Sequence, residues 1–418
     1  MTGPQTAGDP LAATPPSVAD RLLTASTTTL LLVVPFAGSA GVRGGLLVLA
    51  AVALCMRLRA NLALLLERFP RPVLALFAAW AALSIASLAW SRDRAYSLAE
   101  LKPELLYPSL ALTFFFLAAR EDRWRPWWSA LMAGTALAVA ANLLQELMPF
   151  ALSRHALDGG PGHLSTHLVL MTPLLFAMVW PRPWGREHGA LALVVALAFV
   201  VVAAWLTENR IVWAALGAQL VAGIAAWRVS AHGDPAATRS IVRVTLAAGL
   251  ILVAAFATTV VERSGQGVRL ASPIAAQLER DLRPRIWGTA AELFGKAPLL
   301  GHGFGREILS DAFRPLTPRT VSHPEIRHAH NVFFDVALQT GLAGLAVFVV
   351  LLAALALEYK SYLSNARTAP LGIMGLAVLA GFVVKNLTDD FLYRHNSLLF
   401  WAIHGILLGL AHDTRRRP

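Results

Sequence analysis

Residues 189–206 read Gly-Ala-Leu-Ala-Leu-Val-Val-Ala-Leu-Ala-Phe-Val-Val-Val-Ala-Ala-Trp-Leu and contain no charged side chain. A helix needs about 20 apolar residues to cross a bilayer, and 17 to 25 are tolerated. The stretch therefore predicts a membrane-spanning helix. Among all 418 residues, 56% are hydrophobic and only 15% are charged, whereas soluble domains carry about 25% charged residues. The sequence predicts an all-α polytopic membrane protein.

Similar apolar runs recur along the chain and predict about twelve transmembrane helices. They lie at about 22–40, 44–57, 72–90, 104–119, 127–148, 164–180, 189–206, 211–228, 244–262, 330–355, 370–387 and 397–412. The predicted organisation has five parts: a disordered tail at 1–19, spans one to nine within 20–262, a long loop at 263–329, spans ten to twelve within 330–412, and a basic tail at 413–418. The amphipathic stretch Ile286–Leu293 indicates that the long loop forms a small helical lid on the membrane.

Lysine and arginine are unevenly distributed between the two sides of these spans. With a cytoplasmic N-terminus, eighteen fall in cytoplasmic segments, and ten lie in the loop 263–329, which is too long for the positive-inside rule to count. Eight fall in short external loops: Arg43, Arg92, Arg94, Lys102, Arg154, Arg210, Lys385 and Arg394. We therefore predict that both termini are cytoplasmic and that the long loop lies outside.

The net charge of +11 raises the alternative of a nucleic-acid partner. The arginines, however, are scattered in short clusters between apolar runs, which is the pattern of membrane topology. No nucleic-acid partner is therefore expected. The single Cys55 has no second cysteine in the chain with which to form a disulfide.

Two arginines on the predicted outer side are candidate anion-binding residues. Arg210 ends the stretch Thr207-Glu-Asn-Arg just before a span, and Arg285 lies in Arg283-Pro-Arg-Ile-Trp287 within the long loop. Each has an ordinary alternative: Arg210 as an interfacial arginine that pairs with Glu208, and Arg285 as a solvated arginine stacked on Trp287. Arginine is suited to bind phosphate through its planar fork of donors.

Histidine and aspartate residues flank the last spans on the same side. His330, in His328-Ala-His-Asn331, begins the tenth span and suits a general base, although a structural histidine is the alternative. His328 and His330 form no metal site by themselves, because positions i and i+2 diverge on a helix and no further cluster completes a set. Asp389 ends the eleventh span, where helix capping is the alternative. Gly301-His-Gly-Phe-Gly305 lacks the strand-before, helix-after context of a phosphate loop and predicts a flexible turn.

These residues resemble the O-antigen ligase family, which is often grouped with O-antigen polymerases and pilin oligosaccharyltransferases. The resemblance covers about 135 residues and rests on the order and spacing of four segments. They are Thr207-Glu-Asn-Arg210, Arg283-Pro-Arg-Ile-Trp287, Ala297-Pro-Leu-Leu-Gly-His-Gly-Phe-Gly305 and His328-Ala-His-Asn-Val-Phe-Phe-Asp-Val-Ala-Leu-Gln-Thr-Gly341.

The resemblance implies a metal-independent, inverting glycosyltransferase with a GT-C-type fold, in the bacterial inner membrane and with a periplasmic active site. It implies O-antigen on undecaprenyl pyrophosphate as donor and lipid A–core oligosaccharide as acceptor, with no cofactor. By the same resemblance Arg210 and Arg285 bind the donor phosphates and His330 is catalytic. We add Asp389, His328 and Trp287 as substrate-binding candidates and expect a monomer surrounded by membrane lipids.

Three other functions remain open from the sequence. An O-antigen polymerase or a pilin oligosaccharyltransferase would use the same donor chemistry with a different acceptor. A transporter of lipid-linked glycan is the third. It is disfavoured because transporters carry broken helices near the membrane midplane and paired halves, whereas the polar candidates of this chain gather at one surface.

Overall fold

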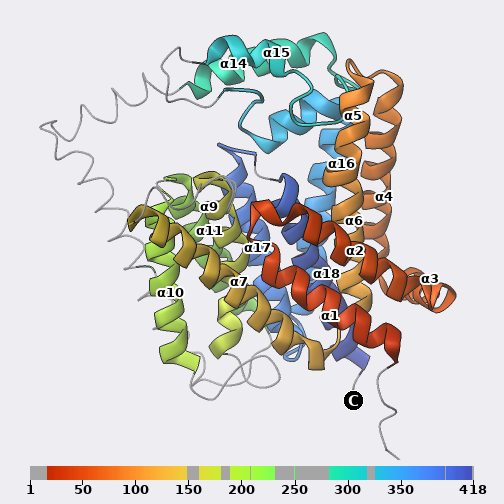
Figure 1. The fold of residues 1–418 in the computed structure, drawn as a ribbon, viewed down its shortest axis with the longest axis vertical. Helices are drawn as coiled ribbons and strands as arrows, with labels where there is room; N and C mark the ends of the chain where they lie inside the picture. The colour runs from red at the N-terminus through yellow and green to blue at the C-terminus, as the bar shows by residue number, and fades with distance from the viewer. Residues whose placement is uncertain are drawn as a thin grey trace, which may run out of the picture.

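A computed structural model describes residues 17–147, 160–179, 189–207, 209–230, 249, 282–317, 325–390 and 392–416, and its regular elements there are all helical (Figure 1). The long helices are α1 (Val18–Val33), α2 (Ala40–Cys55), α4 (Arg71–Ala86), α6 (Tyr107–Ala118), α7 (Glu121–Leu147), α9 (Pro161–Met171), α10 (Gly189–Leu206), α11 (Ile211–Val229), α16 (Val332–Tyr362), α17 (Ala369–Asn386) and α18 (Arg394–Arg416). The shorter helices are α3 (Leu58–Arg68), α5 (Arg94–Leu101), α14 (Arg283–Lys296) and α15 (Ser310–Phe313).

Helices α17 and α18 form the centre of the bundle. α17 packs along α11 and α16, and α18 packs along α6. In the apolar window of α17, 78% of the residues are buried within the protein, against 28% in the window that contains α4. Because α4 is as apolar as α17 but far less covered by protein, its outer face suits contact with lipid rather than with water.

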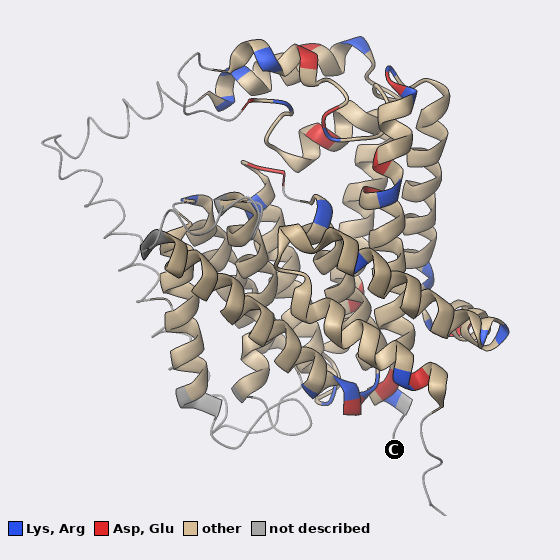
Figure 2. Ribbon diagram, in the orientation of Figure 1, with Lys and Arg blue, Asp and Glu red and all other residues tan. Residues whose placement is uncertain are grey.

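Six helices of the described residues are long and apolar enough to cross a membrane: Ala37–Cys55, Arg71–Ala89, Glu121–Gln145, Ile211–Val229, Val332–Tyr362 and Ala369–Asn386. The two stretches Gly162–Met178 and Ala192–Leu206 are shorter apolar helices. Figure 2 shows charged residues mainly toward the two ends of the bundle, with few between them. This is the distribution that a bilayer imposes, because a charge at its centre is costly. The chain is a polytopic, all-helical membrane protein.

Each predicted span overlaps a helix except 244–262, of which the structure describes only Gly249. The count of twelve therefore stays a prediction. Several boundaries differ by a few residues; the first predicted run, at about 22–40, is helical over Val18–Val33. The run predicted from about residue 330 begins as a helix at Val332, because the Asn331 side chain accepts hydrogen bonds from the first free N–H groups of α16. Helix α3 was not predicted, since its mixture of leucine and arginine is too polar for a span.

Helix α16 is interrupted at Gly341, where φ is 68° and ψ is −166°. The break frees backbone groups that pair with the loop after α14. The N–H of Leu342 donates to the Pro298 carbonyl at 2.8 Å, and that of His302 donates to the Leu338 carbonyl at 2.8 Å. Backbone groups without helical partners are therefore satisfied by the loop.

The turn Gly301–Gly305 is correctly predicted as a turn, but its backbone is fixed by this pairing. Gly301 has a φ of +68°, and a Cβ at this position would lie 2.5 Å from the Gln339 carbonyl carbon. Only glycine fits this left-handed position against another backbone. The residues that follow the turn are consequently held at a defined place above α16.

Helices α14 and α15 lie together at one end of the molecule (Figure 1). α14 buries Ile286, Ala290 and Leu293, which recur with helical spacing on one face, against Phe313 and Leu338. The predicted amphipathic stretch is thus helical. Its function as a lid stays a prediction.

Candidate active site

Arg210 lies at the N-terminus of α11, level with the residues that follow α17. The two helices run antiparallel, because Trp227 near the end of α11 clusters with Ile373 near the start of α17. The register is fixed at mid-helix, where a Cβ on Gly381 would lie 2.2 Å from Gln219 Nε2. From this contact, α11 leads back to Arg210 while α17 leads forward to the segment that follows it. Because the helices are antiparallel, both paths reach the same end of the bundle. Its side chain is exposed, and the alternative partner Glu208 lies outside the described residues.

His330 lies between the first turn of α14 and the start of α16. Its backbone adopts a left-handed conformation with φ of 50°, which is uncommon for a residue other than glycine. Its side chain is 35% exposed, and its Nδ1 lies 3.4 Å from Asp389 Oδ1. The ring is therefore anchored on one nitrogen and accessible to a ligand.

Asp389 connects His330 to the end of α17. Its second oxygen lies 3.5 Å from Nζ of Lys385, a lysine with no exposed side-chain surface. Burial would raise the pKa of Asp389, but the Lys385 ammonium and the hydrogen bond with His330 outweigh burial and hold this pKa below its ordinary value. The carboxylate is thus charged and shared between a lysine and a histidine. Helix capping, the alternative function considered for this residue, does not account for these contacts.

His328 is enclosed, unlike its neighbour. Its Nδ1 lies 2.9 Å from Asp335 Oδ2, and its ring centre lies 4.1 Å from that of His330. Burial lowers the pKa of His328 well below its ordinary value, so the ring is neutral. Only 8% of its side chain is exposed, which leaves little surface for a substrate.

His328, Asp335 and Asp390 bring together three buried groups that could hold a metal ion, with ligand atoms within 4.8 Å of one another. The interpretation that no further residues complete a metal set around His328 was therefore wrong. The expected divergence of His328 and His330 was also wrong, because both precede α16 and their ring centres lie 4.1 Å apart. The guanidinium of Arg306, however, already acts electrostatically on His328 and on both carboxyl groups. A second cation there would be repelled by the first.

Arg283 and Trp287 lie four residues apart on the face of α14 that contacts this site, whereas Arg285, two residues from each, lies on the opposite face of the helix. Trp287 Nε1 donates to the Ala329 carbonyl at 3.1 Å, next to His330. Arg283 Nε donates to the Thr388 carbonyl at 3.2 Å, next to Asp389. Arg285 lies between these two residues only in the sequence: its exposed side chain points away from the contacts, so the described structure does not bring it to His330. The first turn of α14 therefore borders the His330–Asp389 pair.

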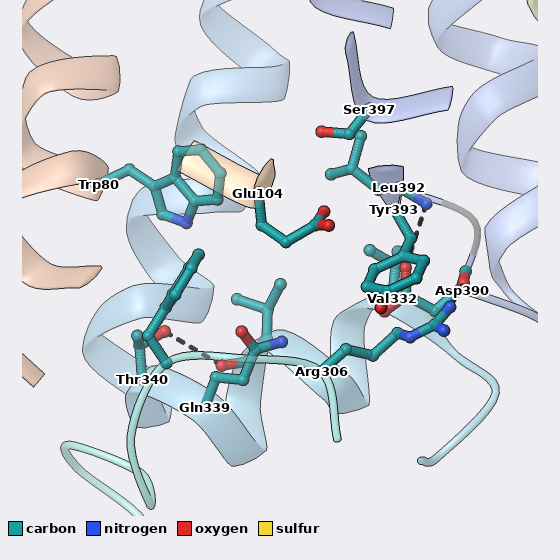
Figure 3. Close-up of a pocket in the computed structure, with 12 residues that line it drawn as sticks. Trp80, Glu104, Arg306, Val332, Gln339, Thr340, Asp390, Leu392, Tyr393 and Ser397 are labelled. Atoms are coloured by element: carbon teal, nitrogen blue, oxygen red, sulfur yellow. Dashed lines mark hydrogen bonds between the residues drawn. The ribbon is translucent and has the colours of Figure 1, made fainter. Parts of the chain in front are cut away.

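Arg306 and Tyr393 belong to this region but were missed in the sequence. Figure 3 shows Arg306 reaching toward Asp390 and Tyr393 at the edge of a small cavity. Arg306 Nη1 donates to the Asp390 carbonyl at 2.7 Å, and its Cζ lies 3.7 Å from the centre of the Tyr393 ring. The cavity has a volume of about 40 Å³, which is space for a few water molecules but not for a sugar. Glu104 and Gln339 line it from two further helices.

A signal for Arg306 was present: it follows directly the glycine-rich turn Gly301–Gly305. A turn with fixed backbone places the next side chain reproducibly, which makes such a residue a candidate for a structural or binding contact. Tyr393 carried no comparable signal, because its partner lies more than eighty residues away.

Comparison with known proteins identifies the kind of protein that carries this site. Residues 162–349 match a family model described as O-antigen ligase, and this range includes Arg210, Arg285, Arg306 and His330. No curated protein matches the chain. Residues 162–349 therefore form a domain of the O-antigen ligase family of glycosyltransferases, which covers ligases and polymerases.

Proposed function

We propose that the protein is an O-antigen ligase. It transfers O-antigen polysaccharide from undecaprenyl pyrophosphate to the lipid A–core oligosaccharide at the periplasmic face of the inner membrane. The proposal rests above all on the half-exposed His330 beside the charged Asp389, at the end of the bundle to which Arg210 and α14 also belong. A base and guanidinium groups at one end suit a reaction in which a hydroxyl displaces a phosphate ester.

The reaction is a single displacement with inversion at the anomeric carbon. A hydroxyl oxygen of the acceptor attacks C1 of the first donor sugar as the bond from C1 to the diphosphate oxygen breaks. His330 receives the hydroxyl proton, and the electron pair of the broken bond leaves on undecaprenyl diphosphate. Arg210 and Arg285 stabilise the charge that grows on this leaving group, where catalytic stabilisation is most effective.

Asp389 has a different role from the one expected for it. Because its Oδ1 lies 3.4 Å from His330 Nδ1, we assign it to orient the imidazole rather than to bind the substrate. The other ring nitrogen, Nε2, then faces the acceptor hydroxyl. Trp287, through its contact at Ala329, holds α14 against this segment, and His328 supports it from within.

No metal ion takes part in this mechanism. The positive charge that a metal would supply comes from arginine side chains, and His330 itself accepts the proton. Undiminished transfer in EDTA is the expected result. Loss of transfer in EDTA that divalent ions restore would contradict the proposal and would direct attention to His328, Asp335 and Asp390.

The proposed arrangement in the membrane has twelve spans, a GT-C-type fold, cytoplasmic termini and a monomeric chain. It is supported by the excess of arginine in the cytoplasmic connections. It is also supported by the position of α14 at one end of the bundle (Figure 1), next to which His330 lies through the contact of Trp287 with the Ala329 carbonyl.

The experiment that tests the function uses the purified protein with undecaprenyl-pyrophosphate-linked glycan and rough lipopolysaccharide. The wild-type protein is expected to join glycan to the lipid A–core, and His330→Ala is expected to lose this activity. His302→Gln is the matched control, because His302 lies in the turn beside α16 and its ring forms a single hydrogen bond among the described residues, with the Leu293 carbonyl. A protein that instead extends one lipid-linked glycan with another is a polymerase.

A deletion strain separates the same two functions in the cell. Loss of a ligase leaves polymer on its lipid carrier and the core unmodified, whereas loss of a polymerase leaves core that carries a single repeat. Loss of glycan from pilin alone would identify the protein oligosaccharyltransferase.

A further inference from the structure

Arg306 is enclosed by the segment that carries Asp389. Besides its contacts with the Asp390 carbonyl and the Tyr393 ring, its Nη2 lies 3.5 Å from Glu307 Oε1. Only 12% of its side chain is exposed, and its Nε has no hydrogen-bond partner among the described residues. An arginine so enclosed does not reach a substrate in the way that an exposed one does.

The segment between α17 and α18 depends on such contacts for its shape. Asp390 N–H donates to Asp389 Oδ1 at 3.1 Å, and the Asp389 carbonyl accepts from Val332 N–H at 3.1 Å. The backbone of Asp390 thus contacts the Asp389 carboxylate through its N–H and Arg306 through its carbonyl. If Arg306 moved, the Asp390 backbone would move with it and would shift the Asp389 carboxylate that faces His330.

We propose that Arg306 is a positioning residue, which fixes the Asp390 peptide and thereby holds the Asp389 carboxylate against His330. This inference rests on the proposed function, in which His330 is the base. Arginine suits the task because its planar group donates in one direction while its face stacks on an aromatic ring. Lysine has no planar face and provides only the charge.

The turn Gly301–Gly305 holds Arg306 at a fixed position relative to α16. Gly303 N–H donates to the Gln339 carbonyl at 2.9 Å, and Gly305 N–H donates to Gln339 Oε1 at 2.9 Å. Arg306 is therefore tied to α16, the same helix that begins beside His330. Helix α16 thus fixes the position of both His330 and Asp389, although the two residues lie 59 positions apart in the sequence.

The test compares Arg306→Gln and Arg306→Lys with the wild-type protein in the purified transfer assay. Arg306→Gln is expected to lower kcat by about 10- to 100-fold, the scale of a misplaced catalytic group. KM for the lipid-linked donor is expected to be unchanged, because Arg306 does not contact the diphosphate. Arg306→Lys is expected to recover only part of kcat. Arg314→Gln is the matched control, since Arg314 is an exposed arginine of the same region that pairs with Glu325.

A double-mutant cycle isolates the positioning role. Asp389→Asn removes the charge that Arg306 is said to position, so Arg306→Gln is expected to have little further effect in that background. Equal fold losses in both backgrounds, or a raised KM with unchanged kcat, would overturn the inference. Tyr393→Leu provides a second route if the arginine variants fail to fold: it removes the ring beneath Arg306 and is expected to lower kcat with the same dependence on Asp389.

The outcomes separate this inference from the proposed function. If His330→Ala retains transfer, the assignment of the base fails. If His330→Ala is inactive while folded Arg306→Gln has normal kcat, only the positioning role fails.

Discussion

Two polar clusters meet at adjacent residues, and their environments differ. The open cluster consists of His330, Asp389 and Lys385, and the closed cluster consists of His328, Asp335, Asp390 and Arg306. Interaction with Lys385 and His330 lowers the pKa of Asp389 despite burial. Burial and the neighbouring Asp335 carboxylate raise the pKa of Asp390 well above its ordinary value. Neighbouring carboxyl groups with opposite pKa shifts are typical of a site in which one group acts and the other supports it.

The largest effect is expected from comparing the two histidines. His330→Ala removes the proposed base, whose help contributes typically 10²–10⁴-fold, and should lower kcat by that range while the protein remains folded. His328→Ala should instead lower the thermal unfolding midpoint in detergent, because it leaves the buried Asp335 carboxyl without its partner. Equal activity losses with equal stability in the two variants would contradict the division into open and closed clusters.

Arginine-to-lysine changes at the rim should come next in size. Arg210→Lys and Arg285→Lys keep the charge but lose the bidentate fork. Removal of one such stabilising contact typically costs about 10²–10³-fold in kcat. Single-turnover measurements with a labelled donor would detect the loss. Near-normal transfer in either variant would remove that arginine from the phosphate site.

Asp389→Asn should lower kcat by about 100-fold, because a neutral amide orients the imidazole less firmly. The substitution also tests the charge on this residue. Its folded-state pKa lies below the ordinary value of 3.8, so it stabilises the fold above about pH 4 and loses this contribution as the pH falls further. Wild-type unfolding midpoints should therefore decline more steeply below pH 4 than those of Asp389→Asn. Parallel curves would show that folding does not lower the pKa of Asp389.

Asp390→Asn should have the smallest effect, less than about fivefold in rate, or about 1 kcal/mol. An amide resembles the protonated carboxyl that a raised pKa implies. The sign of its pH dependence is opposite to that of Asp389. The unfolded state releases the proton of Asp390 above about pH 4 while the folded state retains it, so the wild-type loses stability with rising pH relative to Asp390→Asn. An inactive Asp390→Asn variant would contradict this prediction. So would a stability of the variant relative to wild-type that is lower at pH 7 than at pH 4.

The helices and the family could be predicted from local patterns in the sequence. Runs such as 189–206 identify spans because apolar length alone decides membrane crossing. The contact between Arg306 and Asp390 could not be predicted in this way, since it joins residues 84 positions apart. Asp389 was identified by its place at a helix end, but its interaction with His330 depends on how α16 and α17 meet. Local composition specifies which helices form. It does not specify which helix ends meet in the folded protein and join their polar side chains in one network.

The break at Gly341 divides a 31-residue helix into parts of unequal length. From Leu342 to Tyr362, at 1.5 Å per residue, the lower part is about 31 Å long, close to the thickness of the hydrocarbon layer. The upper part, from Val332 to Thr340, is only about 14 Å long. We therefore expect the lower part to span the hydrocarbon layer, and the nine residues above the break to hold His330 at the level of the lipid head groups. At that level the diphosphate of the proposed donor would stay hydrated while its polyprenyl chain remained dissolved in the membrane.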